Sequence, residues 1–262
     1  MDELRRLFAL DGRVALITGA SGGIGEAFAA TLARAGAEVM LHGRNAAALQ
    51  SVVETLRAED RVAESITADL CDPSACQRLI DATLARFGRL DILVNCAGMN
   101  RRKPALDVTA DDFDTILAVN LRSLFFLSNA AVHAMRVIGG GRIVHVASLT
   151  SFIGLGTTSV YGATKAAVAQ LAKTHAVEWA KYNVQVNCLA PGFIETPLTS
   201  KSLWGDERKR RWLLDRIPAR RAGAPDDLSA TLLLLASPQA TYLTGQTIAV
   251  DGGVLAGGSW ED

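Results

Sequence analysis

The chain has 262 residues, of which 49% are hydrophobic, enough to bury one large α/β core. Lysine plus arginine equals aspartate plus glutamate at 27 each, so no overall field attracts nucleic acid or an acidic membrane surface. The apolar run near the N-terminus is too short for a secretion signal or a membrane span. We therefore expect a cytoplasmic protein that binds neither nucleic acid nor membrane.

The four cysteines, Cys71, Cys76, Cys96 and Cys188, lack the spacing of a metal finger or a redox pair. Four in 262 residues also make no disulfide framework. We expect them to be reduced and mostly buried. The four histidines show no paired-ligand spacing, so no catalytic metal is expected.

In chain order, short aliphatic runs alternate with longer segments rich in alanine and leucine. The runs predict seven strands, at residues 14–18, 38–42, 62–66, 91–95, 142–148, 184–190 and 246–252. The segments between them predict helices near residues 23–35, 45–58, 73–87, 111–137, 157–181 and 226–236. This alternation, without a composition break, predicts one α/β domain over residues 1–262. We expect a Rossmann-like, doubly wound parallel sheet of seven strands with helices on both faces.

Residues 193–222 break this rhythm, because they form a long charged segment that includes GDERKRRW. A connection of this length in a compact domain is usually functional. We expect a substrate lid here, with a solvated helical excursion as the alternative.

The first predicted strand runs directly into the glycine-rich stretch TGASGGIG at 18–25, which a predicted helix follows. Glycines in this position permit a tight turn and let backbone amides approach a pyrophosphate at the positive end of the helix. The spacing is GxxxGxG, and no lysine followed by serine or threonine completes a P-loop. The stretch therefore predicts a dinucleotide site.

The second predicted strand ends in LHGRN at 41–45, where an acidic side chain would bind the ribose diol of NAD. Arg44 is placed there instead, and its planar guanidinium suits a 2′-phosphate. We predict NADP(H) in preference to NAD(H), with a solvated loop arginine as the alternative.

Further motifs follow in order: NCAG at 95–98, Asn120, Ser148, YGATK at 161–165, and Pro191-Gly192. Together with the glycine loop they resemble the short-chain dehydrogenase/reductase family over residues 13–253. The family usually has a second asparagine where this chain has Cys96. The resemblance implies that Tyr161 is the general acid or base and that Lys165 binds the nicotinamide ribose. It also implies that Ser148 holds the substrate carbonyl and that Asn120 organises a water on the proton path.

The chemistry of these residue types agrees with the implied roles. Tyr161 and Lys165 are four residues apart on a predicted helix, so both side chains lie on one face. A free phenol ionises only near pH 10, and a neighbouring ammonium favours the phenolate. Ser148 follows the fifth predicted strand, where it can donate to an oxygen that gains charge. Each residue alone is common in structural roles, so the prediction depends on their joint occurrence.

The resemblance also implies a set of cofactor contacts along the same edge of the sheet. These are Gly19, Ser21, Gly23, Ile24, Gly25, Arg44, Asp69, Leu70, Asn95, Ala97, Gly98, Tyr161, Lys165, Pro191, Gly192 and Thr196. Asp69 would meet the adenine edge, with a helix cap as an equal alternative, and Thr196 would meet the nicotinamide carboxamide. Family members assemble through the helices predicted at 111–137 and 157–181, which implies a homotetramer.

Three segments resemble the sugar-acid branch of the family, the gluconate 5-dehydrogenases and 2-deoxygluconate 3-dehydrogenases. They are GMNRRKP at 98–104, EWAK at 178–181 and DRIPAR at 215–220. Arg101 or Arg102 would clamp a substrate carboxylate, with a solvated basic loop as the alternative. We expect the chain to interconvert a secondary alcohol and a ketone, on a sugar acid such as gluconate or 5-ketogluconate. A 3-oxoacyl-(acyl-carrier-protein) reductase and, outside the enzymes, a dinucleotide-sensing regulatory protein stay open as alternatives.

Overall fold

One parallel sheet organises the molecule. The computed structural model describes residues 7–258, apart from the side chains of residues 198, 201 and 202. The strands lie in the order β3-β2-β1-β4-β5-β6-β7. They are β1 (Val14–Thr18), β2 (Glu38–Gly43), β3 (Ala63–Thr67), β4 (Ile92–Asn95), β5 (Gly141–Val146), β6 (Val184–Pro191) and β7 (Thr247–Val250). The order reverses between β1 and β4, the point at which open α/β sheets bind ligands.

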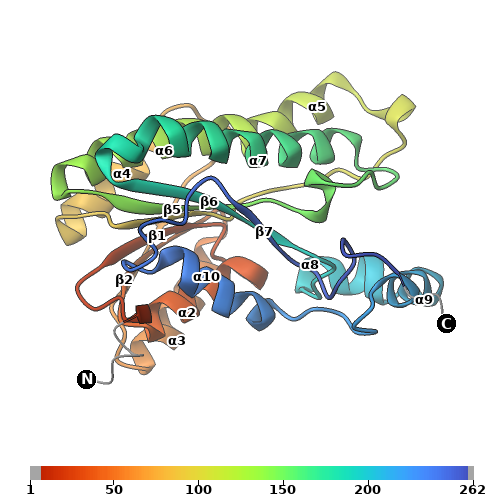
Figure 1. Cartoon of the computed structure of the whole chain (residues 1–262), viewed down its shortest axis with the longest axis horizontal. Helices are drawn as coiled ribbons and strands as arrows, with labels where there is room; N and C mark the ends of the chain where they lie inside the picture. Colours follow the sequence, from red (N-terminus) through yellow and green to blue (C-terminus); the bar gives the residue numbers. More distant parts are fainter. Residues whose placement is uncertain (1–6, 259–262) are drawn as a thin grey trace.

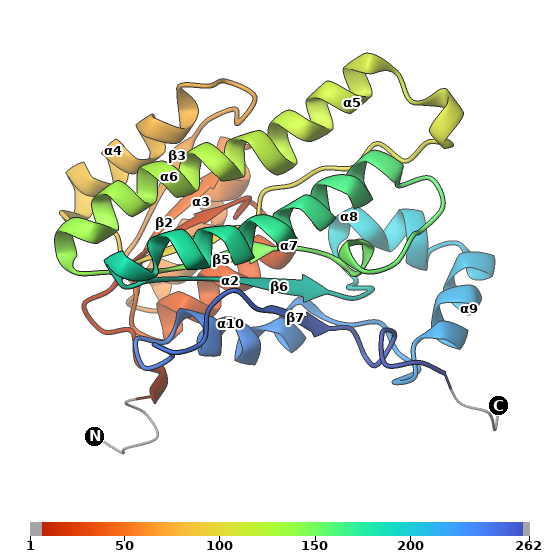
Figure 2. The same ribbon diagram turned by 45° about the horizontal axis from the view of Figure 1, so that its top comes forward.

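Helices cover both faces of the sheet, which confirms the predicted fold class (Figure 1). One face carries α4 (Ala75–Phe87), α5 (Ala110–Leu117), α6 (Ser123–Met135) and α7 (Ser159–Trp179), and the other carries α2 (Gly23–Arg34), α3 (Ala46–Ala58) and α10 (Ser229–Ala236). Each face has its own apolar core, built around Phe28 and Leu49 on one side and around Leu79 and Val168 on the other. Figure 2 shows α8 (Pro197–Thr199) and α9 (Glu207–Arg216) beyond the end of the sheet.

The long helix predicted at 111–137 is interrupted. It begins one residue earlier than predicted, at Ala110, because Thr109 and Asp112 form a capping box that satisfies the first-turn amides. A π-helical turn, Ala118–Arg122, then separates α5 from α6. The stretch ends at Gly139, whose left-handed backbone (φ +87°) suits glycine.

This helical stretch also meets the length and composition of a membrane span. Ala110–Ile138 has a mean hydropathy of 1.4 over its most apolar window, and 44% of that window is buried inside the molecule. Its buried residues, among them Leu124, Leu127 and Met135, belong to the core beneath α4 and α7. Packing on the sheet thus accounts for part of the apolar composition.

All four cysteines are free thiols, as predicted. Cys76 and Cys188 are buried, whereas Cys71 and Cys96 are only half-buried, so the prediction of burial holds for two of the four. Burial raises the pKa of Cys96 and of Cys188 to about 12, which keeps both thiols protonated.

Candidate active site

Four segments singled out in the sequence meet at the carboxyl edge of the sheet, because parallel strands all end there. The glycine loop follows β1, the NCAG motif begins at the last residue of β4, Ser148 follows β5, and Pro191 ends β6. The switch point between β1 and β4 lies at the centre of this edge.

Close backbone approach explains the glycines of the loop after β1. A side chain at Gly19 would lie 2.9 Å from the backbone of Ala97, and one at Gly25 would lie 2.1 Å from the Gly19 carbonyl oxygen. Only glycine fits either position. A β-carbon at Gly23 would lie 3.4 Å from that of Thr196, so Thr196 lies beside the glycine loop.

The helix that follows the loop has an open N-terminus. Gly22 precedes α2 and supplies no side-chain cap. Side chains do cap the helices α3, α5, α8 and α9, through Asn45, Thr109, Thr196 and Asp206 respectively. The first-turn amides of α2 are therefore open to an anion, and the helix dipole favours one. This geometry fits a dinucleotide pyrophosphate.

Thr18, which the sequence analysis did not single out, joins the two glycine-containing segments. Its hydroxyl oxygen accepts the amides of Cys96 and Ala97, both at 3.1 Å, and its hydroxyl donates to the Val94 carbonyl at 3.4 Å. A threonine directly before the first glycine of the loop is the signal that could have identified it. Thr18 fixes the spacing between the loop after β1 and the segment after β4.

The Asn95 side chain contacts a neighbouring helix and strand. It is buried, and its side-chain amide nitrogen lies 3.1 Å from the Ser128 hydroxyl and 3.1 Å from Nδ1 of His145. These contacts join β4 to α6 and β5. In this structure Asn95 therefore positions the strand end that carries the NCAG motif.

Asn120, Lys165 and Gly98 converge beside that motif. A β-carbon at Gly98 would lie 3.5 Å from Oδ1 of Asn120 and 3.5 Å from Nζ of Lys165. Asn120 accepts the Met99 amide (2.8 Å) and donates to the Met99 carbonyl (2.9 Å), and its Nδ2 also reaches the Thr164 hydroxyl (3.2 Å). It lies in the π-helical turn, a distortion frequent at functional sites.

Tyr161 and Lys165 lie on one face of α7, as predicted. The Lys165 ammonium is 5.7 Å from the centroid of the Tyr161 ring and donates to the Val146 carbonyl at 2.6 Å. Lys165 is 4% exposed. Since a buried ammonium without a partner is costly, this carbonyl at the end of β5 is needed to hold it there.

Ser148 reaches the same region through a short helical turn, Leu149–Ser151. Its oxygen accepts the Thr150 amide at 3.2 Å, and the Ser151 hydroxyl ties the turn to α7 by donating to the Lys165 carbonyl at 2.7 Å. A serine hydroxyl has one donor and two acceptor positions. Because the Thr150 amide occupies only one acceptor position of Ser148, the hydroxyl proton stays available to a substrate oxygen.

Arg44 is exposed at the end of β2, and no carboxylate follows that strand. A β-carbon at the preceding Gly43 would lie 3.1 Å from the Ser21 side chain, so the end of β2 contacts the glycine loop. Nearby, Asp69 accepts the amide of Cys71 at 2.9 Å. Burial and then the charge of Asp69 raise the pKa of Cys71, and the charges of Arg122 and, to a smaller extent, Arg44 oppose that shift.

The two loop arginines after β4 differ in their contacts. Arg101 forms ion pairs with Asp111 (2.6 Å) and Asp112 (3.1 Å), and Lys103 pairs with Asp112 at 2.5 Å. The hydrogen bond from Lys103, with those from Thr109 and Arg101, holds the pKa of the Asp112 carboxyl well below its usual range. Arg102 is exposed. The loop is thus fastened to the start of α5 by the residues on either side of Arg102.

The segment predicted as a lid is largely helical. It contains α8, a π-helical turn (Ser200–Trp204) and α9. Trp204, Leu213 and Ile217 form a small separate core with Phe193 and Val254. A cavity of about 160 Å³ lies at its base, between the end of β6 and Ile217. Thr196 accepts the Thr199 amide at 3.3 Å and so caps α8.

Comparisons with known proteins agree on one family. Residues 19–255 match the family model described as Enoyl-(Acyl carrier protein) reductase. A 2-dehydro-3-deoxy-D-gluconate 5-dehydrogenase of Escherichia coli is 41% identical over 95% of this chain and 98% of that protein. A tropinone reductase homolog of Arabidopsis thaliana is 39% identical over 96% and 93%. The solved structure of a gluconate 5-dehydrogenase from Burkholderia cenocepacia, in complex with NADP and tartrate, superposes with a TM-score of 0.93, at 37% identity over 97% of this chain and 100% of that one.

Proposed function

Because the chain belongs to the short-chain dehydrogenase/reductase family of oxidoreductases, we propose that it is an NADP(H)-dependent enzyme that interconverts a secondary alcohol and a ketone on a sugar acid. The observation that carries this proposal is the convergence of Asn120 and Lys165 on Gly98, with Tyr161 on the same face of α7. The glycine loop and the uncapped start of α2 lie at the same edge of the sheet.

Each of these side chains has a distinct task in carbonyl reduction. The bound nicotinamide cofactor supplies the hydride. The Tyr161 hydroxyl passes a proton to the carbonyl oxygen, and the Ser148 hydroxyl donates a hydrogen bond to that oxygen as its charge grows. Lys165 keeps a positive charge beside the phenol. Asn120 holds the Met99 backbone on both its amide and its carbonyl, which fixes the loop over the site.

Arg44 supports NADP(H) as the preferred cofactor. It is exposed at the end of β2, directly after a glycine that contacts the glycine loop, and no acidic side chain competes for the ribose there. A guanidinium binds a phosphate in a bidentate manner. The solved gluconate 5-dehydrogenase that resembles this chain has NADP bound.

Arg102 is the side chain that we assign to the substrate carboxylate. Arg101 is committed to Asp111 and Asp112, whereas Arg102 is exposed between the two basic residues that hold the loop. The next amide, that of Lys103, donates to the Thr157 carbonyl at 3.1 Å, four residues before Tyr161. This contact keeps the loop beside the start of α7. A sugar-acid substrate also agrees with the names of two of the similar proteins.

A panel of carbonyl compounds with NADPH tests the proposal. We expect turnover of 5-ketogluconate to exceed that of a neutral ketone and of an acetoacetyl thioester. Preference for the thioester would favour a 3-oxoacyl-(acyl-carrier-protein) reductase. Binding of NADPH without reduction of any carbonyl would favour a dinucleotide-sensing regulatory protein.

We further propose that the enzyme is a cytoplasmic single-domain homotetramer in which residues 193–222 close over the substrate. Phe126 on α6 and Val177 on α7 are 54% and 81% exposed, which supports an interface on this face. A parallel bridge between Ile194 and Gly223 ties the two ends of this segment together. Sedimentation or light scattering would measure the assembly.

A further inference from the structure

A second polar cavity lies at the amino edge of the sheet, opposite the candidate active site. It has a volume of about 140 Å³, and its lining includes Arg13, Asp91, Arg142 and the glycines at 139–141. A single water needs roughly 10–15 Å³, so the cavity can hold a small molecule. The residues come from the starts of β1, β4 and β5 and from the segment after α10.

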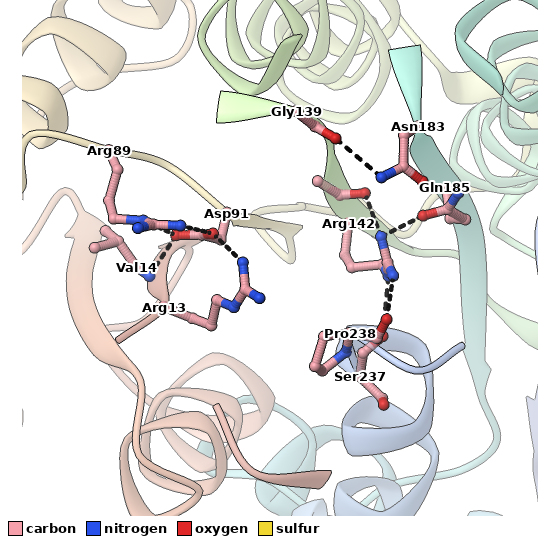
Figure 3. Close-up of polar contacts among 11 residues, drawn as sticks. Arg13, Val14, Arg89, Asp91, Gly139, Arg142, Asn183, Gln185, Ser237 and Pro238 are labelled. Carbon is pink, nitrogen blue, oxygen red and sulfur yellow. Dashed lines mark hydrogen bonds and ion pairs between the residues drawn. The ribbon is translucent and has the colours of Figure 1, made fainter. Parts of the chain in front are cut away.

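One side of the cavity holds a fully paired carboxylate. Asp91 is buried and accepts hydrogen bonds from Arg89 (2.7 Å to each oxygen), from Arg13 (2.9 Å) and from the Val14 amide (3.0 Å), as Figure 3 shows. Burial alone would raise the pKa of Asp91, but these hydrogen bonds outweigh it and hold the pKa below its ordinary value. Asp91 thus stays charged and shares two guanidinium groups.

The other side holds a buried guanidinium without a carboxylate. Arg142 is 7% exposed. Its guanidinium donates to the carbonyls of Ser237 (2.9 Å), Pro238 (2.8 Å) and Gly141 (3.0 Å), and to the side-chain oxygen of Gln185. Within residues 7–258, no acidic side chain is within ion-pair distance of it. Four of its five N–H groups are therefore used, all by neutral oxygens.

Positive charge exceeds negative charge around this cavity. Arg13, Arg142 and Asp91 line the cavity, and Arg89 pairs with Asp91 from outside the lining, so three guanidinium groups lie in this region with the carboxylate of Asp91. Burial, and then the charge of Arg13, lowers the pKa of Arg142 to about 10. The carbonyls that end α10 carry only about half a negative charge in total. The three guanidinium groups and the one carboxylate thus leave a net formal charge of about +2 in this region.

Arg13 and Arg142 line the cavity from the starts of β1 and β5. Figure 3 shows the Arg13 guanidinium beside Asp91 and the Arg142 guanidinium beside Gln185, Ser237 and Pro238. Arg13 uses one of its N–H groups on Asp91, and its side chain is 41% exposed, so the cavity opens to solvent there. Gly139 has no atom within 4 Å of a built β-carbon, which leaves its backbone accessible.

We propose that this cavity is a binding site for a small oxyanion, a phosphate or a carboxylate, held between Arg13 and Arg142. The Arg13 guanidinium, which uses only one N–H group on Asp91, can donate two parallel hydrogen bonds to either group, and Arg142 adds its one remaining N–H. An anion there would pair the buried charge of Arg142, which neutral carbonyls only solvate. The site lies at the strand starts, whereas the dinucleotide site lies at the strand ends, so the two ligands would bind together.

The test is calorimetry and thermal unfolding of the NADPH-saturated protein with inorganic phosphate, with succinate as the carboxylate probe and sodium chloride at matched ionic strength as the reference. Saturation with NADPH keeps phosphate out of the dinucleotide site. We expect saturable binding and a rise in Tm with at least one of the two anions. The anion that responds identifies the ligand class.

Arg13→Gln and Arg89→Gln form the matched pair. Both side chains hydrogen-bond Asp91, but only Arg13 lines the cavity. We expect Arg13→Gln to raise the Kd of the anion about tenfold or more and Arg89→Gln to leave it within about twofold of the wild type. Arg142→Lys, which keeps the charge but loses the fork, is a second variant. Equal binding by Arg13→Gln and the wild type, or no response to either anion, would overturn the proposal.

Discussion

The two edges of the parallel sheet use polar residues in opposite ways. At the carboxyl edge the groups keep unused capacity: α2 starts without a side-chain cap, Ser148 keeps its proton, and Arg44 is exposed. At the amino edge the same types of group are mostly satisfied, as Asp91 and Arg142 show. Unused donors at the carboxyl edge are available to ligands, whereas most polar groups at the amino edge pair with one another and hold strand starts together.

This contrast follows from the direction of the chain. Helix N-termini follow the strands at the carboxyl edge, where they offer amides to anions. Helix C-termini precede the strands at the amino edge, and they attract cations such as Arg142. The oxyanion cavity is the place where the amino edge keeps excess charge. Four predictions test how far the contrast holds.

The largest expected effect is on Tyr161. We expect Tyr161→Phe to lower kcat/KM by about 10²–10⁴-fold, because general acid catalysis is lost, with NADPH binding retained. Tyr182→Phe is the matched control at the opposite edge, where the Lys181 ammonium lies 5.1 Å from the ring centroid of Tyr182. Steady-state kinetics and NADPH titration measure both. Equal activities of the two variants would contradict the proposed mechanism.

Arg44 should have the next largest effect. We expect Arg44→Ala to lower kcat/KM for NADPH by about 10–100-fold and to leave that for NADH nearly unchanged, because a charged hydrogen bond to the 2′-phosphate is lost. Arg61→Ala is the control, since Arg61 is exposed before β3 at the amino edge. If the ratio of kcat/KM for NADPH to kcat/KM for NADH is the same in Arg44→Ala and the wild type, Arg44 does not bind the 2′-phosphate.

Three buried histidines, His42, His145 and His175, make stability depend on pH. His145 on β5 and His175 on α7 have ring centroids 6.2 Å apart. Burial lowers the pKa of His145 to about 3, and burial also lowers the pKa of His175. Their stabilising effect is complete above the unfolded value near 6.5. It is lost as the pH falls below that value, because the unfolded chain takes up protons that the folded chain does not.

For His145 the free energy of unfolding should fall by about 1.4 kcal/mol per pH unit as the pH falls below the unfolded value. The asparagine of His145→Asn still offers a polar partner to Asn95. We expect this variant to reduce the slope of the unfolding free energy against pH by the contribution of one histidine. Urea unfolding at pH 7 and pH 5 measures it. His133→Asn, at an exposed position on α6, serves as the control, and an unchanged slope in His145→Asn would show that His145 does not stay neutral.

The smallest effect concerns the substrate loop. We expect Arg102→Ala to raise KM for a keto acid about fivefold, the value of an exposed charge pair, and to leave KM for a neutral ketone unchanged. Arg101→Ala should instead affect both substrates, since Arg101 fastens the loop to Asp111 and Asp112. If both substrates respond equally to Arg102→Ala, the arginine does not bind the carboxylate.

Much of the carboxyl edge could be predicted from the sequence, because its signals are local. Residues 18–25 combine a strand, glycines and a helix start in one stretch, and Tyr161 and Lys165 are one helical turn apart. Alternation of strands and helices was enough to predict the sheet and its seven strands. The predicted boundaries were within a few residues of those observed.

The contacts that the sequence could not reveal join residues far apart in the chain. Thr18 binds the backbone of residues 96 and 97, and Asn95 meets His145, although no local pattern relates these positions. The difference between Arg101 and Arg102 also needed the position of α5, since adjacent arginines look alike until the fold brings two aspartates to one of them.

The amino acid sequence by itself therefore determined the order of the elements and the family, because propensity and short spacing act within a few residues. Only the tertiary structure decided which charges are paired and which are left over. Burial and the partners of a guanidinium depend on strands that are neighbours in space, as Arg142 beside the segment after α10 shows.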